Sequence, residues 1–147
     1  MGVQTDVVIA DQSEAQDIAN SDTPASTWVG FTFNGFHEVH LCTLLSLLKA
    51  GSPSAEVDHY LNVVEYITPR DQESPVVSVA GPKEVAELAA VASLDEDEFE
   101  SLAQSWGTTE ESDGWTGEDV RELLRELGDL AESASLERKS LFLWQSL

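Results

Sequence analysis

The chain has 147 residues, and its 28 acidic side chains against 7 basic ones give a net charge of -21. This length suits one domain with a single core, and a hydrophobic fraction of 41% favours a folded protein over a disordered one. The charge disfavours nucleic acids and anionic membranes as partners, because both are bound mainly through Lys and Arg.

The acidity has two interpretations. A dispersed negative charge keeps a protein soluble, for example in salty surroundings where ions screen its self-repulsion. A concentrated charge forms an acidic face that docks on a basic protein, as in an inhibitor or an immunity protein. Residues 84–120 contain many acids and no base, so we expect this span to form one strongly negative surface.

The single cysteine, Cys42, cannot form an internal disulfide, which fits a reducing compartment. The N-terminus carries Asp6 and no basic residue, unlike a secretory signal, and no apolar run reaches the roughly 18 residues of a membrane span. We therefore expect a cytoplasmic protein. The sequence leaves its oligomeric state open.

The predicted elements begin with a strand over residues 3–10, which are mostly β-branched. A short helix capped by its first serine is expected over residues 13–20, and turn-forming residues predict a loop over residues 21–35 that carries Trp28. Residues 36–50 then have apolar side chains on nearly all sides of a helix. This pattern is typical of a helix buried at the centre of a domain.

The middle of the chain mixes strands and helices. A short helix is expected over residues 54–61, and strands over residues 62–68 and 75–80. Apolar residues at helical spacing predict two further helices over residues 81–92 and 93–106.

Two capping boxes predict helix starts, at Ser93 with Glu96 and at Thr116 with Asp119. The second box opens the longest amphipathic stretch of the chain, and an apolar run at the C-terminus predicts a closing strand. Together the elements predict one α+β domain over residues 1–147. It has a central buried helix, several amphipathic helices and a small sheet that includes the N- and C-terminal strands.

Residues 34–42, NGFHEVHLC, hold two of the three histidines and the cysteine. His37 and His40 are three residues apart and share a helix face, which suits part of a zinc site. The other ligands are not evident, because Cys42 points to a different side of the helix and the order of residues is not H-E-x-x-H. A nucleophilic pair of Cys42 with His59 would need a contact that nothing in the sequence requires. We therefore expect no metal and no other cofactor, and interpret these residues as part of a buried helix.

The order of the segments resembles the YfbM-like family of small bacterial proteins of unknown function. Phe36, His37 and His40 match an aromatic-His-x-x-His stretch that precedes leucines in that family. Two later helices of the family are matched by Pro82, Val85, Leu94, Asp97 and Glu98. The resemblance implies an α+β fold and no known activity.

Two hypotheses for the function follow. Nucleotide-binding, hydrolase and paired-cysteine motifs are absent, which favours a binding protein, although an enzyme stays open. The first hypothesis is a non-catalytic interaction module that docks a basic protein through the acidic region. The alternative is a small-molecule binding protein or enzyme whose pocket lies at the N-terminus of the His-bearing helix. Its walls would be Trp28, His37 and His40, with His37 as an acid or base.

Overall fold

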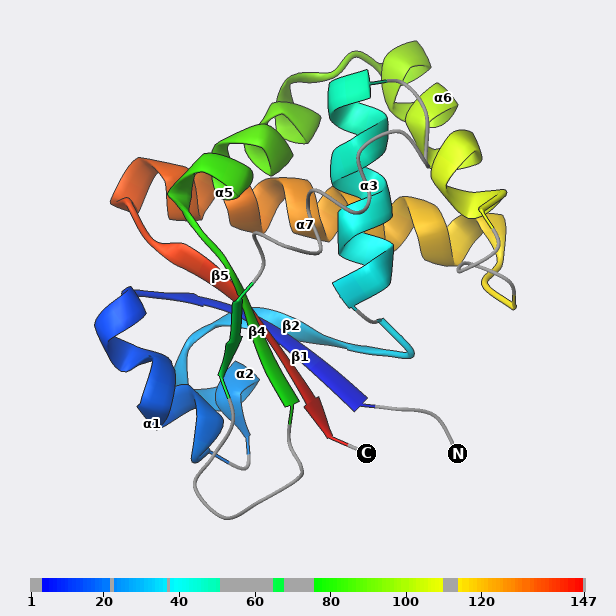
Figure 1. The fold of residues 1–147 in the computed structure, drawn as a ribbon. Coiled ribbons are helices and arrows are strands. Elements are labelled where there is room, and N and C mark those ends of the chain that lie inside the picture. Colours follow the sequence, from blue (N-terminus) through cyan, green and yellow to red (C-terminus); the bar gives the residue numbers. More distant parts are fainter. Residues whose placement is uncertain are drawn as a thin grey trace.

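The computed structural model describes residues 4–21, 23–36, 38–50, 65–67, 76–109 and 114–146. They form one antiparallel sheet of five strands in the order β2-β1-β5-β4-β3, with helices against both faces (Figure 1). The strands are β1 (Gln4–Ala10), β2 (Val29–Asn34), β3 (Glu65–Ile67), β4 (Val76–Ala80) and β5 (Ser140–Ser146). The helices are α1 (Ala15–Ala19), α2 (Pro24–Thr27), α3 (Glu38–Ala50), α5 (Pro82–Ala89), α6 (Glu96–Gly107) and α7 (Gly117–Glu137), with 3-10 turns at Gln12–Glu14 and Ala90–Ser93. The predicted α+β class is confirmed, as is a small sheet that includes both terminal strands.

The two terminal strands lie in the interior of the sheet. β1 pairs with β2 and β5, and β5 pairs with β1 and β4. Alternate residues of β1 enter different cores, because successive side chains of a strand point to opposite faces. Val7 and Ile9 join the core formed with α3, α5, α6 and α7, whereas Val8 and Ala10 pack with residues of α1. Burial on both faces explains the nearly continuous apolar run of this strand.

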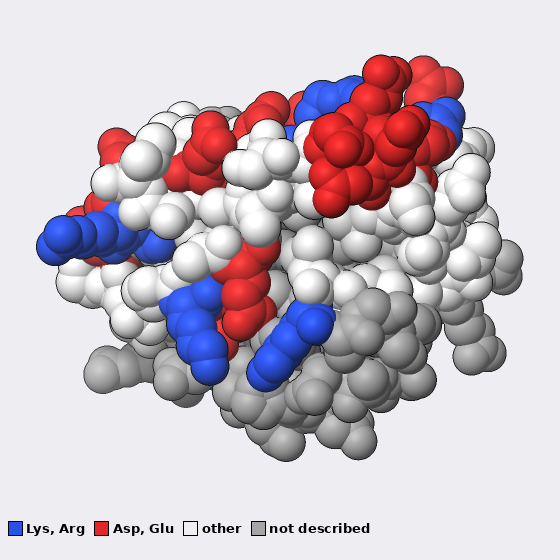
Figure 2. Space-filling model, turned by 90° about the horizontal axis from the view of Figure 1, so that it is seen from above, with Lys and Arg blue, Asp and Glu red and all other residues white. Residues whose placement is uncertain are grey.

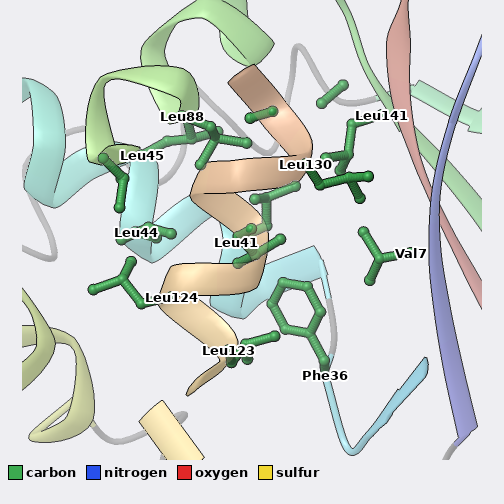
Figure 3. Close-up of a cluster of buried hydrophobic side chains, with 14 of the residues drawn as sticks. Val7, Phe36, Leu41, Leu44, Leu45, Leu88, Leu123, Leu124, Leu130 and Leu141 are labelled. Atoms are coloured by element: carbon green, nitrogen blue, oxygen red, sulfur yellow. The ribbon is translucent and has the colours of Figure 1, made fainter. Parts of the chain in front are cut away.

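α3 is the buried central helix that its apolar pattern predicts. Leu41, Leu44 and Leu45 are at most 1% exposed. They belong to the same cluster as Phe36 and leucines of α5 and α7 (Figure 3). Each fully buried leucine contributes about 1.5–3 kcal/mol relative to an exposed one. The helix therefore supplies a large part of the apolar burial on this face of the sheet.

The prediction of a loop over residues 21–35 is wrong, because this segment contains α2 and the edge strand β2. Asp6 on β1 is hydrogen-bonded to both of these elements. Its buried carboxylate accepts hydrogen bonds from the Ala25 backbone N–H at 3.0 Å and from Thr32 Oγ1 at 2.9 Å. Gly30, one of the small residues of this segment, is required by the strand pairing, because a Cβ at this position would collide with the backbone of β1.

Two helical segments begin at aspartates, two residues away from the predicted serine caps. Asp11 is the cap in place of Ser13, and Asp95 is the cap in place of Ser93. In α6, Asp95 Oδ1 accepts a hydrogen bond from the Glu98 backbone N–H at 2.8 Å. Aspartate caps a helix as well as serine does, so an acid-rich sequence offers several equivalent caps. The box of Thr116 and Asp119 at the start of α7 is confirmed.

The remaining predicted elements agree with the structure where it describes them. β3 and β4 fall within the predicted strands over residues 62–68 and 75–80, and β5 is the predicted closing strand. α5, α6 and α7 are the three predicted amphipathic helices. The short helix predicted over residues 54–61 lies outside the described residues.

Candidate functional site

His40 lies near the start of α3 and is only 5% exposed. Its ring stacks on the indole of Trp115, with ring centroids 4.4 Å apart and an interplanar angle of 21°. Its backbone carbonyl accepts a hydrogen bond from Trp106 Nε1 at 3.0 Å. His37, the other candidate on this helix, lies outside the described residues, as does His59.

The stack of His40 on Trp115 is part of a larger aromatic cluster. Its members are Phe33, Phe36, His40, Trp106 and Trp115. Phe33 and Trp106 meet the Trp115 indole edge-on, with centroids 5.5 and 5.8 Å apart. Pairs of this kind contribute about 0.5–1.5 kcal/mol beyond the burial of their area. The cluster joins β2, α3 and α6 to the start of α7, so packing accounts for the buried position of His40.

Trp28, the third predicted wall of the pocket, lies on the opposite face of the sheet. It packs against a second core that contains Val8 and Val77, and its Nε1 donates to Glu14 Oε1 at 3.4 Å. The aromatic cluster packs on the core formed with α3 and α7. The structure therefore does not bring Trp28 and His40 together in one pocket.

Cys42 follows His40 by two residues and is fully buried among apolar side chains of the core. Within the described parts of the chain, no three His, Cys, Asp or Glu side chains gather closely enough to hold a metal ion. The geometry thus assigns Cys42 to the packing of α3.

A different feature has the shape of a binding site, namely a groove between α3 and α6. Four leucines line it, and we call them its floor: Leu47, Leu48, Leu94 and Leu102. Four polar residues of α6 form one wall: Asp97, Glu98, Ser101 and Ser105. We call this site the acidic groove. Its volume of about 520 Å³ lies in the range of ligand-binding clefts, and Leu48, Leu94 and Leu102 remain partly exposed in it.

The first turn of α6 brings negative charge to the acidic groove, which Asp97 and Glu98 line. Residues 95–98 are four consecutive exposed acids, and the N-terminal end of the helix dipole stabilises them. The arginines of α7 do not line the groove: Arg121 pairs with Glu100 at 3.1 Å, and Arg125 lies 5.1 Å above the ring of Phe99 in a separate hollow that also contains Asp95 and Glu96. Figure 2 shows acidic side chains gathered over one part of this helical face, with few basic side chains among them. The wall of the groove is therefore anionic.

A second hollow, of about 480 Å³, adjoins the acidic groove. Leu48 lines both of them, and the second hollow also contains Lys49, Lys83, Glu87 and Ala90. Two of the seven basic residues of the chain, Lys49 on α3 and Lys83 on α5, thus lie in the hollow next to the groove. The helical face is thus anionic at α6 and of mixed charge at Lys49, Lys83 and Glu87.

Neither a protein-family model, nor a curated protein, nor a solved structure matches this chain. The resemblance to the YfbM-like proteins therefore stays a prediction. Among the described residues, no helix combines the length and the apolar character that crossing a membrane requires.

Proposed function

We propose that the protein is a non-catalytic interaction module that binds a basic protein at the acidic groove. The observation that carries this proposal is that partly exposed leucines and exposed carboxylates lie in one concave site. In protein interfaces the apolar centre excludes water, whereas charges around it steer association and select the partner. The net charge of -21 adds long-range attraction for a basic partner. A surface of this kind suits a protein of the inhibitor or immunity type.

The test compares two charge reversals that change the net charge equally. Asp97→Lys alters the wall of the groove, whereas Glu132→Lys alters an exposed position of α7 that does not line it. A fluorescent lysine-rich peptide is the basic probe, and anisotropy gives its Kd in low salt. We expect Asp97→Lys to weaken binding several-fold more than Glu132→Lys, because like charges in direct contact repel most strongly.

Equal weakening by the two variants would contradict the proposal, since it would mean that the peptide responds to net charge alone. Thermal melts of both variants provide the control for folding. A lysine at the start of α6 opposes the helix dipole, which costs about 0.3–1 kcal/mol, so only a small decrease in melting temperature is expected for Asp97→Lys.

A further inference from the structure

We infer that the basic partner enters the acidic groove as an amphipathic helix, with an apolar stripe on the leucine floor and Lys or Arg beside that stripe. This inference rests on the proposed function and adds the conformation and the side-chain pattern of the partner. It follows from the shape of the groove, from the hydrogen bonding that an apolar floor permits, and from the placement of charge.

The floor of the groove favours a partner that satisfies its own backbone. Leu47, Leu48, Leu94 and Leu102 offer no hydrogen-bonding side-chain group, and the α6 wall between Ser101 and Ser105 is the interior of a helix. An extended peptide laid on this floor would find hydrogen-bond partners only among the polar side chains of α6, so N–H and C=O groups that it buried on the leucines would have none, which is costly. A helix bonds these groups internally and presents apolar side chains at spacings of three and four residues.

Two small side chains make room for a partner helix against α6. Ser101 and Ser105 are exposed and lie one helical turn apart, so they share one face of α6. The distance between two packed helices depends on the size of the side chains at their contact, and serines allow a close approach. Leu102, which lies between the two serines in the sequence, lines the same groove.

The charges beside the groove determine where the partner carries its own charges. Asp97 and Glu98 lie on the α6 side, so a Lys or Arg of the partner is favoured there. A helix that extends past Leu48 reaches the hollow where Lys49 and Lys83 lie with Glu87, so the charge there is mixed and favours a base less than the α6 side does. The expected partner is thus basic along the edge that faces α6 and less basic at its far end.

The experiment uses two synthetic peptides of about 15 residues, long enough to form a helix when bound. One carries leucines at helical spacing with lysines beside them, and the other is a scrambled peptide of the same composition without a stripe. Both are titrated into the full chain by fluorescence anisotropy, and far-UV circular dichroism follows the helix content of the peptide. We expect the striped peptide to bind more tightly than the scrambled one and to gain helix on binding.

Matched variants test the site. Ser101→Lys introduces a lysine in the groove, and Ser133→Lys introduces the same side chain at an exposed position of α7 outside it. Lysine is a good helix former, so both variants should fold, which melting curves will check. Ser101→Lys should raise the Kd of the striped peptide about tenfold or more, whereas Ser133→Lys should change this Kd by less than about twofold.

The outcomes separate this inference from the proposed function. If the two peptides bind equally well, and Asp97→Lys weakens the binding of both, the inference of a helical partner is overturned while the proposal of a basic partner stands. If Ser101→Lys and Ser133→Lys act alike on the striped peptide, the groove is not its site and the inference fails. If neither peptide binds, the proposed function fails and the inference fails with it.

Discussion

Two buried tryptophans differ in whether their indole N–H is hydrogen-bonded, and replacing each with phenylalanine isolates that difference. Trp106 is fully buried, and its Nε1 donates to the carbonyl of His40 at 3.0 Å. Trp144 is 5% exposed, and its Nε1 has no hydrogen-bond partner in the structure as described. Both substitutions replace an indole by a smaller ring, so the loss of apolar contact is similar at the two sites.

The polar contributions to the free energy of unfolding have opposite signs. Trp106→Phe loses a hydrogen bond that contributes about 0.5–1.5 kcal/mol and weakens its edge-on contacts with Phe36 and Trp115. Trp144→Phe removes a buried donor without a partner, which relieves a penalty of about 1–3 kcal/mol. With a cavity cost of about 1–2 kcal/mol at each site, we expect Trp106→Phe to destabilise by about 2–4 kcal/mol and Trp144→Phe by about 1 kcal/mol or less.

Urea denaturation followed by far-UV circular dichroism measures both values, because the substitutions alter the tryptophan fluorescence that would otherwise report unfolding. Unchanged m-values would show that the difference lies in the stability of the folded state. If Trp144→Phe destabilises as much as Trp106→Phe, the indole of Trp144 has a partner in solution and the reasoning fails.

Three further predictions concern charge, a strand glycine and a buried carboxylate. The melting temperature should rise from low salt to about 1 M NaCl, where the Debye length falls to about 3 Å, and a flat or falling curve by calorimetry would contradict this. Gly30→Ala should destabilise by about 3 kcal/mol because its Cβ meets the backbone of β1, whereas Gly117→Ala, which has room for a Cβ, should change stability little in the same urea melts. Asp6→Ala should lower the free energy of unfolding by about 2–4 kcal/mol in urea denaturation, since it leaves three donors without their acceptor, and an unchanged midpoint would mean that water replaces the carboxylate.

The longer helices were predictable because their information is local, whereas the four-residue α2 was missed. Leucines at helical spacing predict α3 and α7, and a threonine followed three residues later by an acid predicts the start of α7. β2 was missed although Val29, Phe31 and Phe33 alternate as in a strand, because Gly30 and the small residues before it favour a turn. Pairing with β1 explains Gly30, which allows the close approach of the two strands, and Thr32, which donates a hydrogen bond to Asp6.

The candidate site was less predictable because it is assembled from distant segments. The floor of the acidic groove combines Leu48 from one helix with Leu94 and Leu102 from another region of the chain, and no local pattern links them. The contact of His40 with Trp115 is equally non-local. The sequence predicted that the region from residue 84 to residue 120 is negative, and could not predict which of its acids lie beside exposed apolar surface.

Under the proposed function, the two interpretations of the acidity apply to different acids. Glu122, Glu126 and Glu132 are exposed on α7, and none of them lines the acidic groove. Charges of this kind keep molecules apart, and their effect declines as salt shortens the Debye length to about 3 Å at 1 M. Asp97 and Glu98 instead lie beside partly exposed leucines, where a partner's cation would be in direct contact with them. Direct contacts are screened less than distant ones, and apolar contacts do not weaken with added salt. Binding at the groove should therefore persist in salt that abolishes long-range attraction, and this persistence distinguishes an interface from a merely acidic surface.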